Sequence, residues 1–199
     1  METVLVEKKN INEVVELLKQ DEVVAFPTET VFGLGVKFGN LSALEKIYEI
    51  KHRSHSKAVS LMIYDSQDIE KYAYVNTNAQ KLIDEFMPGM ITLLKKKSIL
   101  SDDFTAGLET IGIRIPDDPF VLELLKRVGP MLVTSANISG QETLLNDLDV
   151  YHEFNGKLKM IVKGKCQNTL ASTVVKIDDD VTILRQGCIS EEKIMEVLK

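Results

Sequence analysis

The chain has 199 residues, of which 44% are hydrophobic and 27% charged, and 24 basic against 30 acidic residues give a net charge of −6 at pH 7. This composition is ordinary for a globular protein, and a chain of this length can bury a large core without disulfides or a structural metal. The acidic balance argues against indiscriminate nucleic-acid binding. We expect a single domain over residues 1–199.

Cysteine and histidine usage gives no sign of a metal site. Cys166 and Cys188 lack CxxC spacing, and only three histidines accompany them, so no protein-bound metal is expected. No apolar run approaches the roughly 18–20 residues that cross a membrane, and Met1–Asn10 lacks the apolar core of a signal peptide. These features predict a reduced, cytoplasmic setting without membrane association.

The predicted elements mix helices and strands without strict alternation. Helical spacing predicts a helix over residues 11–18 capped by Asn10, and the capping box of Ser42 and Glu45 predicts another. Further helices are expected from 66, over 77–86, over 119–128 and after 190. Strands are expected over 23–26, 59–64, 91–95, 110–115, 131–134, 160–163, 172–177 and 181–185. This order predicts an α/β fold with a mixed sheet and helices on its faces.

The string PTETVFGLG, residues 27–35, follows the first predicted strand. Its proline ends a strand, its threonines present hydroxyl groups, and its glycines let a ligand approach the backbone. A lone TxT would more often bond local backbone in a strand-to-strand turn. The length of the string favours a ligand site instead, with Thr30 as a candidate.

Basic residues gather after the second predicted helix: Lys46, Lys51, His52, Arg53, His55 and Lys57. Cations at a helix C-terminus are stabilised by the helix dipole, which is a purely structural role. Arginine and lysine also suit a phosphate clamp. The patch alone does not separate these two interpretations.

Arg114 lies in TIGIRIP, residues 110–116, where isoleucine alternates with other residues. An arginine inside an apolar strand needs a carboxylate partner. That partner is either a protein Asp or Glu, which is the commoner case, or a carboxylate of the ligand.

Polar groups follow later strands in TSANISG (134–140), STVV (172–175) and LRQG (184–187). Ser135 and Asn137 suit a helix cap as well as a ligand site. No G-x-S-x-G elbow and no Ser, Cys or His combination indicates covalent catalysis. Because ligands of open α/β sheets bind at strand ends, these segments predict one shared small-molecule pocket.

Taken in order, these motifs resemble the threonylcarbamoyl-AMP synthase family, also called YrdC or Sua5. The resemblance runs from Pro27 to Gly187 through PTETVFGLG, the KxR of Lys51 and Arg53, RIP, TSANISG, STVV and LRQG. It implies an open, twisted mixed sheet flanked by helices, with a concave, positively lined surface. It also implies that L-threonine, bicarbonate and ATP give threonylcarbamoyl-AMP and pyrophosphate. That product serves the N6-threonylcarbamoyl modification of adenosine 37 in tRNA, with separate partner proteins for transfer.

The resemblance also implies roles for individual residues. Threonine binding falls to Thr30, Arg114 and Ser172, with Arg114 on the carboxylate. ATP binding falls to Arg53, Lys57, Thr110, Ser135, Asn137 and Arg185. Lys51 and Arg53 are the expected catalytic residues, and Mg²⁺ is expected through the ATP phosphates rather than on protein ligands. Since the attacking group belongs to the substrate, catalysis is expected from positioning and charge neutralisation.

The sequence departs from the family pattern at a few positions. Phe32 stands where tyrosine is usual, and Ser54 and Ala58 replace prolines of the following loop. These changes bear on substrate affinity and on the order of the loop, because proline restricts the free chain.

Two other functions stay open at this point. The basic patch at 51–57 suits an RNA-binding module in tRNA or ribosome maturation, although the net charge of −6 and the lack of aromatic platforms oppose it. A carbamoyl-transfer domain, as found inside hydrogenase maturation proteins, is a weaker alternative because its relatives carry further domains.

Overall fold

The computed structural model describes residues 2–89, 91–97, 99–178 and 180–199. Its strands are β1 (Val4–Val6), β2 (Val24–Phe26), β3 (Gly33–Lys37), β4 (Ser60–Met62), β5 (Ile91–Lys95), β6 (Thr110–Arg114), β7 (Met131–Ser135), β8 (Met160–Val162), β9 (Val174–Ile177) and β10 (Val181–Arg185). They form one mixed sheet in the order β1-β8-β2-β3-β7-β4-β6-β5-β9-β10. The expected mixed sheet is therefore confirmed, and each predicted strand is present within two residues at either end.

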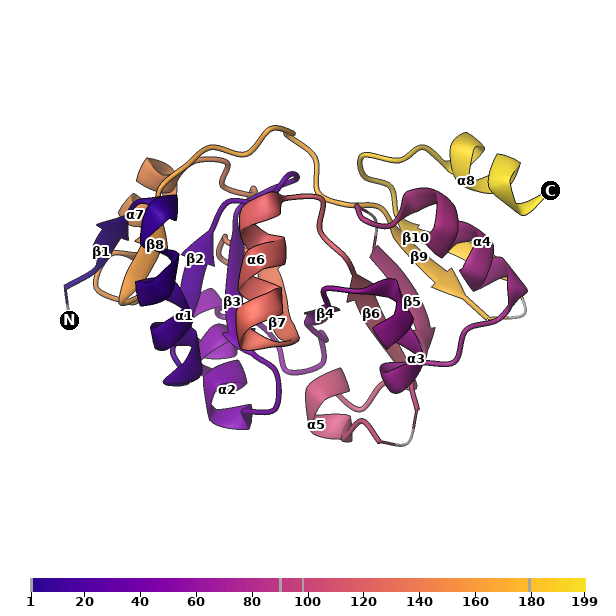
Figure 1. Ribbon diagram of the computed structural model, residues 1–199, viewed down its shortest axis with the longest axis horizontal. Helices are drawn as coiled ribbons and strands as arrows, with labels where there is room; N and C mark the ends of the chain where they lie inside the picture. Colours follow the sequence, from indigo (N-terminus) through magenta and orange to yellow (C-terminus); the bar gives the residue numbers. More distant parts are fainter. Residues whose placement is uncertain (1, 90, 98, 179) are drawn as a thin grey trace.

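Helices flank the sheet on both faces (Figure 1). They are α1 (Ile11–Lys19), α2 (Leu41–Lys51), α3 (Ile69–Tyr72), α4 (Thr77–Phe86), α5 (Asp102–Thr105), α6 (Pro119–Val128), α7 (Asp147–Phe154) and α8 (Glu191–Leu198), with 3-10 turns at Lys8–Asn10 and Ser66–Asp68. The sequence patterns did not predict α5 and α7. Both are short and carry acidic residues in their first turn, so little apolar periodicity marks them.

Two of the predicted helix caps lack the expected side-chain bond, although α1 does begin at Ile11 directly after Asn10. Asn10 makes no capping bond, because its side-chain amide donates to Glu13 at 2.8 Å. The capping box at Ser42 is also absent, since α2 begins one residue earlier and Asn40 accepts from the backbone N–H of Ala43 at 3.1 Å. The helices predicted over 119–128 and after 190 begin where expected, and the side chains of Asp118 and Ser190 cap them.

Side-chain alternation divides the core into two layers. Val24 and Phe26 of β2 belong to an apolar cluster with residues of α1 and α6, whereas Ala25 between them belongs to the cluster under α2, α4, α7 and α8. Because successive side chains of a strand point to opposite faces, these clusters lie on opposite sides of the sheet. Met62 and Val133 lie at the limit of the α1 and α6 cover, and beyond them the same face is open.

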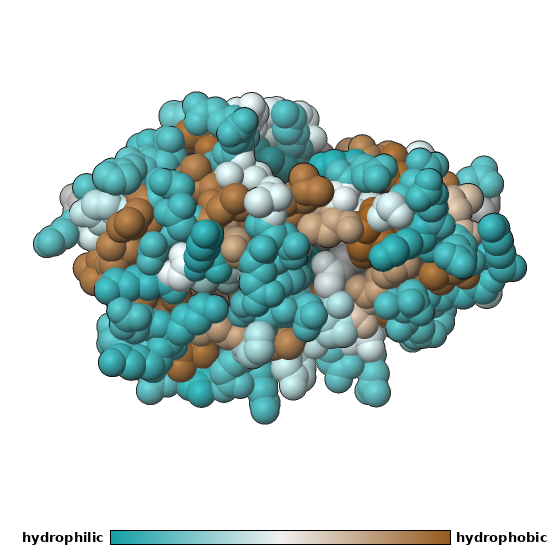
Figure 2. Space-filling view, turned by 90° about the horizontal axis from the view of Figure 1, so that it is seen from above, coloured by the Kyte–Doolittle hydropathy of each residue, from teal (hydrophilic) through white to brown (hydrophobic). Residues whose placement is uncertain are grey.

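A long connection joins β8, beside the edge strand β1, to β9 on the far side of the sheet. Residues 163–173 cross the top of the molecule in Figure 1 between these strands. Seen from above in Figure 2, apolar and weakly polar side chains gather over the middle of this side, with hydrophilic side chains around them.

The strand β3 was not predicted, because its sequence GLGVK carries two glycines and glycine is depleted in strands. Its packing explains the glycine at 35. A Cβ atom there would lie 2.7 Å from Cε1 of Phe26 and 2.8 Å from Cε of Met131. The close contact of β3 with these buried side chains therefore requires glycine.

We expect Gly35→Ala to lower the free energy of unfolding by about 1–3 kcal/mol, as overpacking of a filled core does. Urea denaturation measures the change. Gly33→Ala is the comparison, because its nearest neighbour would be a single methyl carbon of Val133 at 3.0 Å. Equal stability of the two variants would contradict this account of β3.

Candidate active site

A cavity of about 310 Å³ opens on the uncovered face of the sheet. Strand register builds its floor: Thr110, Gly112 and Arg114 alternate along β6, and Met62 pairs with Arg114. Because paired and alternate residues share a face, one side of β6 supplies polar lining while its isoleucines at 111 and 113 enter the opposite core. The alternation that was predicted for this strand thus places Arg114 in the cavity.

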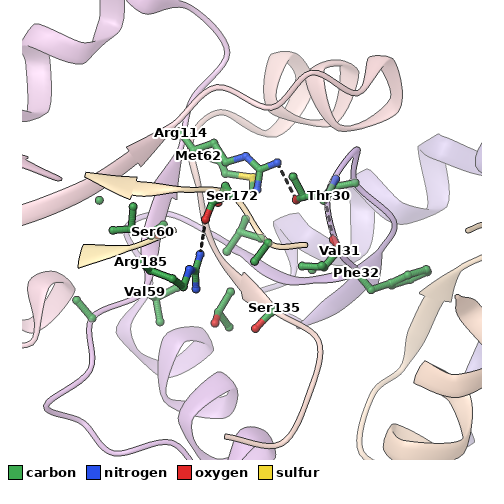
Figure 3. A pocket seen from close by; sticks show the side chains of 18 of the residues that line it. Thr30, Val31, Phe32, Val59, Ser60, Met62, Arg114, Ser135, Ser172 and Arg185 are labelled. Carbon is green, nitrogen blue, oxygen red and sulfur yellow. Dashed lines mark hydrogen bonds between the residues drawn. The ribbon is translucent and has the colours of Figure 1, made fainter. Parts of the chain in front are cut away.

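The connections next to the strands supply much of the walls: 28–32 between β2 and β3, 53–59 between α2 and β4, and 171–172 before β9 (Figure 3). Of the ten residues assigned by resemblance, those that line the cavity are Thr30, Arg53, Thr110, Arg114, Ser135, Ser172 and Arg185. They come from separate segments of the sequence, so the predicted convergence on one pocket is present. Lys51, Lys57 and Asn137 do not line it.

Arg114 is the most buried of the charged lining residues, with 4% of its surface exposed. Its Nη2 donates to a carboxylate oxygen of Glu29 and, at 2.9 Å, to Oγ1 of Thr30. The sequence left open whether the partner of Arg114 is a protein carboxylate or a ligand carboxylate, and the structure shows a protein carboxylate, that of Glu29. Among the described residues, Nη1 of Arg114 has no hydrogen-bond partner, and Arg114 lines the cavity.

Three arginines make the cavity cationic. Of the described residues that line it, none is Asp or Glu. Burial lowers the pKa of Arg53 and of Arg185, and the positive charges of Arg185 and Arg114 respectively lower them further. Arg53 and Arg185 also donate to backbone carbonyl oxygens, Arg53 to that of Ala58 at 2.7 Å and Arg185 to that of Ser172 at 2.9 Å. Like charges held close together in this way favour a bound anion.

Lys51 lies behind the cavity wall and is 1% exposed. Its Nζ donates to the backbone oxygen of Ser135 and, at 2.5 Å, to that of Asn137. Burial, together with the charge of Arg53, lowers the pKa of Lys51 to about 8. The amine therefore fixes the backbone of residues 135–137 from the side that faces away from the cavity.

Asn137 organises the same loop. Its Nδ2 donates to the backbone oxygens of Ile138 and Gln141, both at 2.9 Å. Its Oδ1 must then accept, so the hydroxyl of Ser135 donates to it at 2.6 Å. Asn137 is buried and shapes the wall without lining it.

Thr173 joins the segments STVV and LRQG. Its Oγ1 donates to the backbone oxygen of Ile189 at 2.7 Å and accepts from the N–H groups of Gly187 and Ile189, both at 3.0 Å. This connection holds Ser172 and Arg185 at the cavity. A Cβ atom on Gly187 would lie 2.1 Å from the backbone oxygen of Ala171, so the turn accepts only glycine without moving.

Part of the site was not predicted from the sequence. Glu29, Thr28 and Ser60 received no role, although Thr28 and Ser60 line the cavity and Glu29 holds Arg114. The first two lie in the PTET string, and the expected carboxylate partner of Arg114 was the available signal for Glu29. Ser60 alternates with Met62 on β4, directly after the basic patch, but its type carries no strong signal.

Comparison with known proteins places this geometry in a family. The model of the Sua5, YciO and YrdC family, described as telomere recombination, matches residues 16–187. The chain belongs to this family. The resemblance drawn from the motifs is confirmed.

Several family members are similar to this chain in sequence or structure over most of its length. A putative threonylcarbamoyl-AMP synthase of Methanocaldococcus jannaschii is 39% identical over 187 residues, which cover 91% of this chain and 89% of the relative. The threonylcarbamoyl-AMP synthase of Bacillus subtilis is also 39% identical, over 92% of this chain but 54% of the relative. Crystalline P. abyssi Sua5 complexed with L-threonine superposes with a TM-score of 0.93 at 28% identity, covering 98% of this chain and 61% of that one.

The described residues were also compared with the requirements of a metal site and of a membrane-spanning helix. Within the described residues, no group of three His, Cys, Asp or Glu side chains is placed to hold a metal ion. No helix in the same ranges is long and apolar enough to cross a membrane.

Lys51 predicts a pH dependence of stability. Its pKa is lower in the folded chain, about 8, than the ordinary 10.5 of a lysine. Between these values the unfolded chain binds more protons, so the Lys51 contribution to the free energy of unfolding rises with pH across this window. We expect the stability of the wild type relative to Lys51→Met to increase from about pH 8 to pH 10.5, as measured by urea denaturation.

The matched control is Lys57→Met, which replaces an exposed lysine of the same segment. A relative stability of Lys51→Met that stays constant over the window would show that the amine is not desolvated in the native state.

Gly187 provides a second test of the site. We expect Gly187→Ala to displace the backbone at Ala171 and Ser172, and to lower the free energy of unfolding by about 1–3 kcal/mol or more. The neighbouring exposed Gln186→Ala is the control, with a change within about 0.5 kcal/mol. If the denaturation curves of the two variants coincide, the close approach of Gly187 to the backbone of Ala171 is refuted.

Proposed function

We propose that the chain is an L-threonylcarbamoyladenylate synthase, a nucleotidyltransferase that converts L-threonine, bicarbonate and ATP to threonylcarbamoyl-AMP and pyrophosphate. The observation that carries this proposal is that three arginines line one cavity: the buried Arg114, Arg53 and Arg185. This arrangement suits a carboxylate at one end and phosphates at the other. The relatives named threonylcarbamoyl-AMP synthase support it.

The chemistry needs no nucleophile from the protein. Bicarbonate gives CO₂ by loss of hydroxide. The amine of threonine forms a C–N bond with CO₂, and the proton that leaves the nitrogen combines with the hydroxide to give water. A carbamate oxygen then attacks the α-phosphorus of ATP, and the bond from that phosphorus to the bridging oxygen breaks to release pyrophosphate. Negative charge grows on the phosphates, and the guanidinium groups of Arg53 and Arg185 stabilise it.

The site residues divide by position. The L-threonine complex of the similar P. abyssi Sua5 supports threonine as a substrate, and we assign Arg114, Thr30 and Ser172 to the threonine end of the cavity. Arg53, Arg185, Thr110 and Ser135 form the ATP end. Lys51 and Asn137 act as positioning residues that shape the loop of Ser135, in place of the direct catalytic and ATP contacts that the resemblance implied for them.

Mg²⁺ enters with the nucleotide in this proposal. The absence of carboxylates among the described lining residues fits an ion held by ATP phosphates, and bound Mg²⁺ would neutralise phosphate charge. We further propose that the product serves tRNA modification in the cytoplasm, with partner proteins that complete the transfer.

The RNA-binding alternative is less well supported by the geometry. The basic patch is largely neutralised or buried: Lys46 pairs with Glu22, His55 contacts Glu45, and Lys51 is enclosed. An RNA surface needs exposed, unpaired cations.

We expect threonine-dependent pyrophosphate release from ATP and bicarbonate, and a fall of roughly tenfold to hundredfold in Arg53→Ala through loss of charge-assisted bonds. Release is followed with a coupled phosphate assay over a panel of amino acids. Lys57→Ala is the matched control, because its exposed side chain lies outside the cavity lining.

Absence of threonine-dependent release in the wild type would overturn the proposed function. A loss in Lys57→Ala as large as in Arg53→Ala would instead restore Lys57 to the ATP site.

A further inference from the structure

The guanidinium group of Arg53 uses one edge to bind its own loop. Its Nε donates to the backbone oxygen of Lys57 at 3.0 Å, and its Nη2 donates to that of Ala58 at 2.7 Å. Among the described residues, Nη1 has no hydrogen-bond partner, and Arg53 lines the cavity. Because the guanidinium is planar and rigid, the two carbonyl groups determine where Nη1 points.

These carbonyl groups belong to a loop that lies outside helix and strand, between the end of α2 at Lys51 and the start of β4 at Ser60. Its sequence over 53–58, RSHSKA, contains no proline. Such a loop keeps more conformational freedom in the free chain, so its order must come from hydrogen bonds and packing. Within the loop, the N–H of Lys57 donates to the backbone oxygen of Ser54 at 3.0 Å. This bond folds the loop on itself but does not attach it to the rest of the protein.

Tyr48 of α2 attaches the loop to the core at three points. Its backbone oxygen accepts from the N–H of Arg53 at 2.9 Å. Its ring stacks on that of His55, with centroids 4.7 Å apart and planes inclined by 28°. Its hydroxyl lies 3.1 Å from the backbone oxygen of Lys57 and must donate, since a carbonyl only accepts. Tyr48 is buried, so the core fixes the position of this hydroxyl.

The backbone oxygen of Lys57 is therefore shared by two donors, the hydroxyl of Tyr48 and the Nε of Arg53. A carbonyl oxygen has two lone pairs, and both are used here. The oxygen thus links a buried phenol to an arginine of the cavity. This link needs only the backbone of Lys57, whose side chain is exposed and is not among the described residues that line the cavity.

Glu45 supports the same arrangement from the preceding turn of α2. The Nε2 of His55 lies 2.8 and 2.9 Å from its two carboxylate oxygens. An ionised carboxylate only accepts, so Nε2 carries the proton and the imidazole is held against the ring of Tyr48. Both side chains of the pair are largely exposed, and such a pair contributes little by itself. Tyr48 is the stronger connection between α2 and the loop.

We propose that Tyr48 is a positioning residue for the nucleotide: through the carbonyl of Lys57 it holds Arg53 so that Nη1 meets the phosphates. This inference rests on the proposed function and adds to it a residue that does not line the cavity. Affinity increases because the loop and the arginine are ordered before the nucleotide binds. The phenol should matter for ATP and not for L-threonine, since Arg114 is held by Glu29 and Thr30 of another loop.

The test asks whether the contribution of the Tyr48 hydroxyl passes through Arg53. Tyr48→Phe removes the hydroxyl and keeps the buried ring. A double-mutant cycle combines it with Arg53→Lys, which keeps a positive charge, so that binding stays measurable, but lacks the guanidinium edge. Calorimetry gives dissociation constants for a non-hydrolysable ATP analogue and for L-threonine, and urea denaturation checks that each variant is folded.

Tyr151→Phe is the matched control. Tyr151 of α7 also lies beside a histidine, His152, but is not among the described residues that line the cavity. It should leave the dissociation constants of both ligands unaltered.

We expect Tyr48→Phe to weaken binding of the ATP analogue by about threefold to tenfold, the effect of one neutral hydrogen bond. In the Arg53→Lys background the same substitution should change this affinity by less than about twofold, because the edge that it positions is gone. Binding of L-threonine should also change by less than about twofold, because the two ends of the cavity share no such contact.

An equal loss in both backgrounds would overturn the inference, since Tyr48 would then act without Arg53. Equal weakening of L-threonine would overturn it as well, because it would indicate a general disturbance of the cavity, and so would an unchanged affinity for the ATP analogue. A wild type that does not bind the ATP analogue would end the proposed function itself, so the two failures are distinguishable.

Discussion

The burial of one guanidinium group, that of Arg114, is the constraint on which the site depends. The group lies on the open face of β6 and is 4% exposed, so its charge requires a partner within the protein. Glu29 provides it from the PTET loop, 85 residues earlier in the chain. Removal of one member of such a buried pair typically costs about 3–5 kcal/mol. The pair therefore joins the β2–β3 connection to the centre of the sheet and makes the loop geometry part of the stability of the fold.

The other loops of the cavity follow the same principle, because each is held by a buried polar group that does not itself line the cavity. Lys51 supports the loop at 135–137 from below, and Thr173 fastens the turn at Gly187 to the strand that follows Ser172. Strand β7 ends at Ser135 and strand β10 at Arg185, so these side chains order the residues that follow each strand. Lys51 and Thr173, at 1% and 0% exposure, are thus buried beneath the residues that line the cavity.

Much of this arrangement was predictable from local patterns. Alternation over 110–115 predicted both the strand and the need of Arg114 for a carboxylate, and the polar strand ends predicted one shared pocket. The identity of Glu29 was not predictable, because a contact across 85 residues depends on the order of strands in the sheet. The burial of Lys51 was missed for a related reason: a lysine in a basic run is typical of an exposed surface, and only the packing of the 135–137 loop against α2 encloses it.

The net charge of the whole chain is negative, whereas the charge of the cavity is positive. The two are compatible because surface charges act on a ligand only over a short, screened distance. Acidic residues pair with lysines at the surface, as the half-buried Glu22 does with Lys46 and Lys159, and their fields are screened within roughly 10 Å in salt solution. Within the cavity, Arg53, Arg114 and Arg185 lie in a partly dehydrated space where screening is weak. A net charge of −6 therefore discourages long-range attraction of a polyanion, while the local field still favours a small anion that enters the cavity. The same distinction favours a nucleotide and an amino acid over an RNA backbone as the ligands of this fold.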